Sequence, residues 1–211
     1  MNKFVVEFFG TLLLLFSMVV AYSSFDPPNS IIFVSIAYML LIIVGTDYSG
    51  AHYNPAITIA VLLRGKINIE NAFFYFILQS LGGLVGAYLG SFLVEHMSAS
   101  NMPIATIELN FLKSMGAELL GAFLLAFAMI QSRTISNPLN KYYYGMIMGL
   151  TLGLSIYFLS QYSGGSFNPA VGLGVCAVGI AYWSDIWIFI ISTIAAGALA
   201  PFLYLLFNKD T

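Results

Sequence analysis

The chain has 211 residues, of which 60% are hydrophobic and only 8% are charged, and its mean hydropathy is +0.91. Soluble domains carry about 25% charged residues, so this composition is typical of a polytopic membrane protein. A net charge of −2 without a basic cluster argues against a nucleic-acid partner, and a single cysteine, Cys176, excludes an intrachain disulfide.

Six apolar stretches approach the length of about 20 residues that a membrane-spanning helix needs. In chain order they are Phe4–Tyr22, Ser30–Tyr48, Ala72–Val94, Phe111–Gln131, Tyr142–Ser160 and Ile186–Phe207. Two shorter apolar segments, Asn54–Leu63 and Asn168–Val178, would form helices of only about 15 Å, half the thickness of the hydrocarbon core. We therefore expect an all-α membrane protein with six transmembrane helices and two re-entrant half-helices.

Both short segments open with the same tripeptide, Asn-Pro-Ala. The copies are Asn54-Pro55-Ala56 and Asn168-Pro169-Ala170. They lie 114 residues apart (168 − 54), and each follows a Ser-Gly pair. Proline at the first helical position lacks only an N–H that would be unpaired anyway, so each motif predicts a helix start capped by its asparagine.

The first and fourth spans are also similar to each other. Glu7 and Glu118 are each followed three residues later by glycine and then by a run of small or large apolar residues. The chain thus reads as a single channel domain made of two repeats, about 1–97 and about 111–211. Three spans per repeat invert the second copy relative to the first, and inverted repeats bring their half-helices together near the membrane midplane.

The basic residues predict the orientation. With the amino terminus inside, six of the seven basic residues are cytoplasmic, which satisfies the positive-inside rule and makes both termini cytoplasmic. These six are Lys3, Arg64, Lys66, Arg133, Lys141 and Lys209, and the exception is Lys113.

Two helix starts that meet at mid-membrane would present their positive dipole ends to the same site. Such a site disfavours cations, and asparagine N–H groups there can turn toward a passing neutral solute. Glu7 and Glu118 are the ionisable residues well inside the spans, and they allow two interpretations. Each could belong to a proton or ion pathway, or each could accept hydrogen bonds from the backbone of a re-entrant loop. Their symmetric placement favours the second.

Together, the two Ser-Gly-x-x-x-Asn-Pro-Ala loops, the two Glu-x-x-Gly helices and the order of spans resemble the aquaporin, or major intrinsic protein, family. The resemblance covers nearly the whole chain. It implies a right-handed helical bundle that assembles as a homotetramer with one pore per subunit in the lipid bilayer. It also implies passive flow of water or small neutral solutes, and no cofactor.

The resemblance further implies an outer selectivity filter made of Val34, Ile156, Gly165 and Val171. Water-selective members usually have an aromatic residue, a histidine and an arginine there, and this chain has none of them. The pattern is most similar to plant tonoplast intrinsic proteins, which implies ammonia, urea, glycerol or hydrogen peroxide as possible solutes besides water. A less selective water channel is an equally weighted alternative. A gap of four residues would place Tyr38 in the ring instead of Val34.

Other functions are weaker interpretations of the same sequence. A secondary transporter would need a substrate or ion site beyond two symmetric glutamates. A closed-pore junctional protein is the third possibility. We see no metal-ligand cluster, nucleophile–base pair or phosphate loop, and therefore expect no enzyme. Whether Cys176 in the second half-helix faces the pore stays open.

Overall fold

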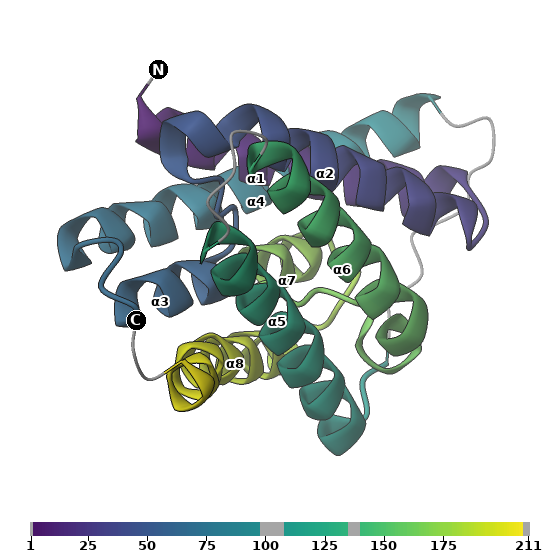
Figure 1. Ribbon diagram of the computed structural model, residues 1–211. Coiled ribbons are helices and arrows are strands. Elements are labelled where there is room, and N and C mark those ends of the chain that lie inside the picture. Colours follow the sequence, from purple (N-terminus) through teal and green to yellow (C-terminus); the bar gives the residue numbers. More distant parts are fainter. Residues whose placement is uncertain (1, 98–107, 135–139, 209–211) are drawn as a thin grey trace.

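The computed structural model describes residues 2–97, 108–134 and 140–208, and Figure 1 shows their arrangement. In chain order the elements are α1 (Lys3–Ser24), α2 (Asn29–Ser49), α3 (Pro55–Leu63), α4 (Ile69–Met97), α5 (Phe111–Thr134), α6 (Asn140–Ser163), α7 (Pro169–Ala177), the 3₁₀ turn η1 (Trp183–Asp185) and α8 (Ile186–Phe207). Lys209, which entered the orientation argument, lies outside the described residues.

The six predicted spans and two predicted half-helices are confirmed. Six helices of the described residues, α1, α2, α4, α5, α6 and α8, are long and apolar enough to cross a membrane. Most extend a few residues beyond the apolar stretches because interfacial polar residues continue the helix. Large apolar side chains cover the outside of the bundle, among them Phe92, Leu150 and Phe202, each about 60% exposed. A surface of this kind suits lipid rather than water.

Glycines allow the long helices to approach one another closely. On α4, Gly82 and Gly86 lie against the main-chain carbonyls of Phe8 and Leu12 on α1, where a Cβ atom would overlap the oxygens. On α6, a Cβ at Gly149 would lie 2.7 Å from the carbonyl oxygen of Ser35 on α2. Small residues at crossings are the usual way in which membrane helices pack.

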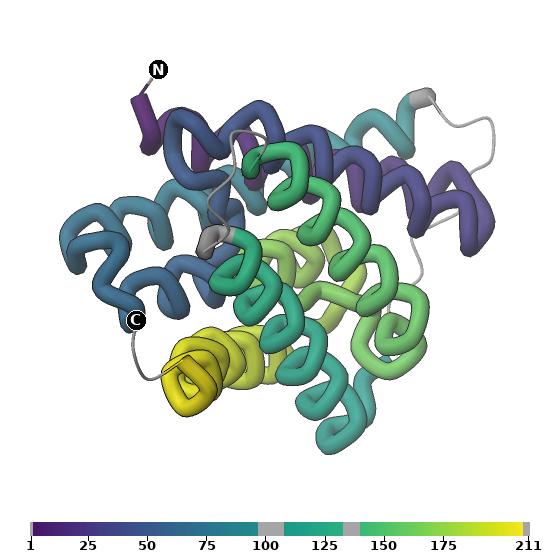
Figure 2. The backbone as a smooth tube through the Cα atoms, viewed as in Figure 1, coloured from purple at the N-terminus to yellow at the C-terminus, as the bar shows by residue number. Residues whose placement is uncertain are grey.

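The two half-helices fill the middle of the bundle. α3 packs against α8, and α7 packs against α4, so each short helix contacts a long helix from the other half of the chain. The continuous trace in Figure 2 shows the start of α1 and the end of α8 toward the same side of the bundle, the left of the view. An even number of spans produces this arrangement.

Candidate functional site

Each asparagine of the doubled tripeptide caps a half-helix. Asn54 and Asn168 have nearly identical extended backbones, with φ of −157° and −159°. Their Oδ1 atoms accept hydrogen bonds from the main-chain N–H of Ala56 at 2.8 Å and of Ala170 at 2.9 Å. A side-chain cap satisfies one of the unpaired donors of a helix start, and proline at the first position lacks another. α3 and α7 therefore begin where the sequence predicts.

The two asparagines also join the halves of the chain. Asn54 Nδ2 donates to the carbonyl oxygen of Phe167 at 3.0 Å, and Asn168 Nδ2 donates to the carbonyl oxygen of Tyr53 at 2.9 Å. Each amide thus holds the residue that precedes the other asparagine. The sequence predicted that these N–H groups turn toward a solute. One N–H of each amide donates to the opposite loop, and the second N–H is left for other partners.

The residues before the asparagines adopt a left-handed backbone conformation. Tyr53 and Phe167 both have φ of +51°, which is rare for residues other than glycine. Their rings lie directly over Gly10 and Gly121, where a Cβ atom would overlap them. The glycine that follows each intramembrane glutamate therefore provides the space for the aromatic ring of a re-entrant loop.

Glu7 is fully buried and accepts four hydrogen bonds. The donors are the Ser49 hydroxyl at 2.6 Å, the main-chain N–H groups of His52 at 3.0 Å and Tyr53 at 2.8 Å, and the Gln79 amide at 2.7 Å. Two of these four donors belong to the segment between α2 and α3, and the Ser49 hydroxyl belongs to the last residue of α2. The carboxylate therefore satisfies the polar groups of a loop at membrane depth, where water cannot.

Glu118 holds the second loop in the same way. It accepts hydrogen bonds from the Ser163 hydroxyl at 2.7 Å and from the main-chain N–H groups of Ser166 at 3.0 Å and Phe167 at 2.6 Å. The halves differ at the position of Gln79, since position 193, which is 114 residues later, is threonine. Its hydroxyl donates to the carbonyl of Phe189 instead of reaching the glutamate.

Sequence reasoning missed several of these partners. Gln79 donates to Thr58 at 3.0 Å as well as to Glu7, and this links the start of α3 to α4. Ser49 and Ser163 both donate to a glutamate. These two serines are separated by the same 114 residues as the asparagines, so this offset applied along the whole chain would have paired them.

One cavity of about 520 Å³ lies at the end of the bundle where α1 ends and α2 begins. Two of the expected filter residues, Ile156 and Val171, line it. Gly165, with φ of +77°, sits beside Ile156, because a Cβ there would lie 3.5 Å from Ile156 Cγ1. Val34 is fully buried in the same hydrophobic cluster but does not line this cavity. It lies one helical turn farther along α2 than Ser30, which does.

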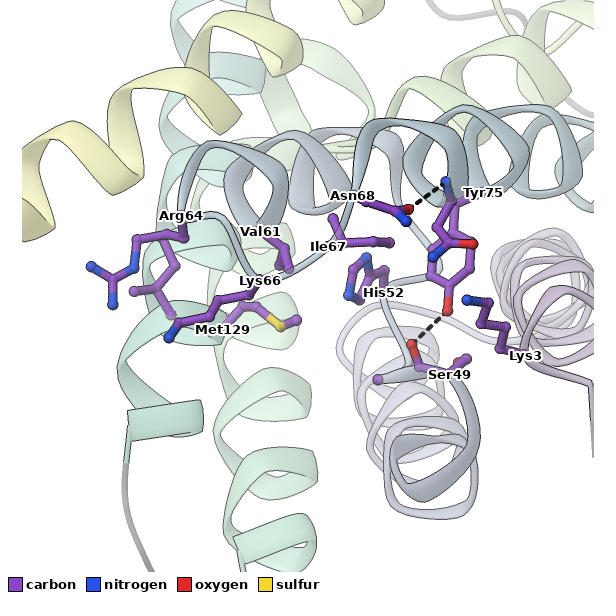
Figure 3. A pocket seen from close by; sticks show the side chains of 13 residues that line it. Lys3, Ser49, His52, Val61, Arg64, Lys66, Ile67, Asn68, Tyr75 and Met129 are labelled. Carbon is purple, nitrogen blue, oxygen red and sulfur yellow. Dashed lines mark hydrogen bonds between the residues drawn. The ribbon is translucent and has the colours of Figure 1, made fainter.

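A second cavity of about 630 Å³ lies at the opposite end of the bundle, and Figure 3 shows it from close by. Three basic side chains line it, those of Lys3, Arg64 and Lys66. His52 also faces this cavity, edge-on to the ring of Tyr75 at a centroid distance of 5.2 Å. The paired asparagines thus lie between two cavities of different character, one mostly apolar and one basic.

Cys176 lines neither of these two cavities. Its side chain is 2% exposed and packs with Ala181 and Phe189, and its Sγ lies 3.5 Å from the carbonyl oxygen of Tyr182. It therefore acts as a small apolar residue between α7 and α8.

Comparison with known proteins agrees with this architecture. The family model described as "Major intrinsic protein" matches residues 1–204. The chain is 30% identical to "Probable aquaporin TIP-type RB7-5A" of Nicotiana tabacum and 29% identical to "Aquaporin TIP2-3" of Arabidopsis thaliana. Each alignment covers 97% of this chain and 86% of the relative. Among solved structures, the aquaglyceroporin from Plasmodium falciparum matches the fold with a TM-score of 0.74 at 19% identity, over 99% of this chain and 95% of that one.

Proposed function

The chain belongs to the major intrinsic protein family, and on that premise we propose how its pore handles solutes. Family membership makes it a multi-pass integral membrane protein and a passive channel for water and small uncharged solutes, not an enzyme. The family and its named relatives do not favour a secondary transporter or a closed-pore junctional protein.

The proposed path runs from the apolar cavity, past Asn54 and Asn168, to the basic cavity. One observation carries this proposal: the two asparagine amides exchange hydrogen bonds with the opposite loops at the point where α3 and α7 begin. A solute at this point meets two positive helix ends and the remaining amide N–H groups. Neutral acceptors are stabilised there, while cations and protons are repelled.

The proposed outer filter consists of Val34, Ile156, Gly165 and Val171. All four are buried, and Gly165 leaves space beside Ile156 that a side chain would otherwise fill. Such a ring offers no charged donor, so it does not discriminate against neutral solutes other than water by electrostatics. The likeness to relatives named as TIP-type aquaporins supports a mixed selectivity, with water accompanied by solutes such as ammonia, urea, glycerol or hydrogen peroxide.

Glu7 and Glu118 are proposed to support the loops rather than to move protons. The donors to their carboxylates are the re-entrant loops, the serine that ends the preceding helix and, in the case of Glu7, Gln79. Donors of this number and geometry stabilise a fixed carboxylate in a network that is fully satisfied.

The repeats, about 1–97 and about 111–211, are proposed to form one channel domain with both termini in the cytoplasm. The placement of Lys3, Arg64 and Lys66 around one cavity supports this orientation, because basic residues favour the cytoplasmic side. A homotetramer is proposed from the family resemblance, and native mass spectrometry of the detergent-solubilised protein tests it directly.

A stopped-flow panel on proteoliposomes tests the function. Water, ammonia, urea, glycerol and hydrogen peroxide would each be driven by a concentration gradient, with protein-free liposomes as the control. A channel gives flux that is linear in the gradient, does not saturate and is independent of ions. Saturating or ion-coupled flux would contradict the proposal, as would permeabilities equal to those of protein-free liposomes for every solute.

A further inference from the structure

Tyr38 occupies the inward face of α2. The buried residues of this helix include Ser30, Val34, Tyr38 and Ile42, which recur every four residues and so form one stripe. Tyr38 is 2% exposed, and its side chain is among the largest that the protein encloses.

The neighbours of this stripe show which way it points. On one side, Ser35 and Met39 pack against the glycines of α6. Gly45, seven residues after Tyr38 and therefore on nearly the same face of α2, lies against the hydroxyl of Tyr53, which also donates to the carbonyl oxygen of Leu41. The stripe is therefore turned away from α6 and toward the residues of the first re-entrant loop. It is directed at the centre of the bundle, where the half-helices meet.

Along α2, Tyr38 lies between the two cavities and lines neither. Ser30 lines the apolar cavity, and Ser49 lines the basic one. At a rise of 1.5 Å per residue, Tyr38 lies about 12 Å along the helix axis from Ser30 and about 17 Å from Ser49. Its ring therefore belongs to the constriction that separates the cavities, one turn nearer the paired asparagines than Val34.

The hydroxyl of Tyr38 makes no hydrogen bond with any described residue. The other buried tyrosines of this region do: Tyr53 donates to Leu41, Tyr75 to Ser49 and Tyr144 to Ala51. In the described part of the chain, some polar side-chain atoms are completely enclosed by protein and have no hydrogen-bond partner. They belong to Ser91, Asn140, Ser155 and Ser192. Tyr38 is not among them, so its oxygen still touches open space.

A buried hydroxyl without a partner is costly, so a molecule in the path must supply the missing hydrogen bond. We propose that Tyr38 is a specificity-determining residue of the pore, which sets its cross-section with the ring and offers a hydrogen bond to solutes with the hydroxyl. The inference rests on the proposed path between the cavities. It narrows the solutes to water, ammonia and hydrogen peroxide, and it excludes glycerol and urea.

The physical reason is a division of roles along the path. The outer ring of Val34, Ile156 and Val171 strips water from a solute without replacing its hydrogen bonds. One turn farther in, Tyr38 restores one hydrogen bond, and its ring narrows the path so that small solutes are favoured over larger ones. The aromatic side chain that the outer ring lacks is thus supplied by Tyr38, on the next turn of α2.

Three variants in proteoliposomes test this. Tyr38→Leu replaces the phenol ring by a shorter side chain and should raise the ratio of glycerol to water permeability by at least about tenfold. Tenfold is the lower end of the steric discrimination that apolar sites achieve. Tyr38→Phe keeps the bulk and should still exclude glycerol, while water permeability falls about threefold with the lost hydrogen bond. Tyr88→Leu on α4, where the tyrosine is 58% exposed, should change neither.

The outcomes separate the two proposals. If Tyr38→Leu folds, as judged by its elution and melting in detergent, and its glycerol permeability equals that of the wild type, Tyr38 does not limit the pore. If Tyr38→Leu does not fold, Tyr38→Phe decides, since unchanged water permeability would overturn the role of the hydroxyl. In both cases a water-conducting wild type leaves the proposed function intact. A wild type that conducts nothing would instead remove the proposed function itself.

Discussion

Gly83 of α4 lies directly against the main-chain carbonyl of Ala170, the last residue of the second Asn-Pro-Ala motif. A Cβ atom at Gly83 would lie 2.5 Å from that oxygen, closer than Cβ atoms approach other atoms in proteins. The relationship recurs with Gly197 of α8, which lies against the carbonyl of Ala56 in the first motif. Each half-helix start is therefore positioned by a glycine on a long helix of the other half.

Replacement of Gly83 by alanine should loosen this contact. Because the opposing atom belongs to the backbone, it cannot rotate away, and overpacking of this kind costs about 1–3 kcal/mol. We expect a lower melting temperature in detergent and reduced water permeability. Gly116→Ala on α5 is the matched control, since no atom lies within 4 Å of its Cβ position. Equal melting temperatures for the two variants would contradict the role of Gly83.

Replacement of Glu118 by glutamine should destabilise the second re-entrant loop. The substitution keeps the shape but turns one acceptor oxygen into a donor, so it opposes the N–H of Ser166 or Phe167. A buried donor without an acceptor costs about 1–3 kcal/mol. Thermal unfolding in detergent measures the loss, with Glu70→Gln at the exposed start of α4 as the control. A proton-pathway role would instead leave the melting temperature unchanged and alter proton flux.

Replacement of Asn168 by aspartate should sharply reduce neutral-solute flux or admit cations. The carboxylate cannot donate to the carbonyl of Tyr53, and it places negative charge at a positive helix end. Water permeability and sodium conductance, measured on the same liposomes, report the two effects. Asn29→Asp at the exposed start of α2 adds the same charge outside the path and should alter neither. Wild-type conductance and selectivity in the Asn168 variant would remove the model of a midplane site.

Replacement of Val171 by arginine should lower ammonia flux more than water flux. Val171 lines the apolar cavity, so the longer side chain would narrow its inner end and introduce a charged donor. A positive donor at a constriction favours water over solutes that are protonated readily. Parallel assays of ammonia uptake and water shrinkage give the ratio. Equal loss of both fluxes would count against the assignment of Val171 to the filter.

The sequence by itself determined the class of the protein and the places where its helices begin. Composition identified a membrane protein, apolar length separated six spans from two half-helices, and proline after asparagine marked both half-helix starts at the residues where α3 and α7 begin. These features are local, because helix length, capping and hydrophobicity depend on residues within a few positions of one another.

Only the tertiary structure decided which atoms meet. The amides of Asn54 and Asn168 bind carbonyls 113 and 115 residues away, and no local pattern encodes such a pair. The inward face of α2 was equally hidden, since a helix that is apolar all round has no polar side to mark its orientation. Both Val34 and Tyr38 were therefore open as pore residues, and packing against α6 and Tyr53 turned Tyr38 toward the centre. Long-range contacts determine such orientations. Any apolar face of a helix can contact lipid, but only a face whose side chains pack against the neighbouring elements can lie in the interior of the bundle.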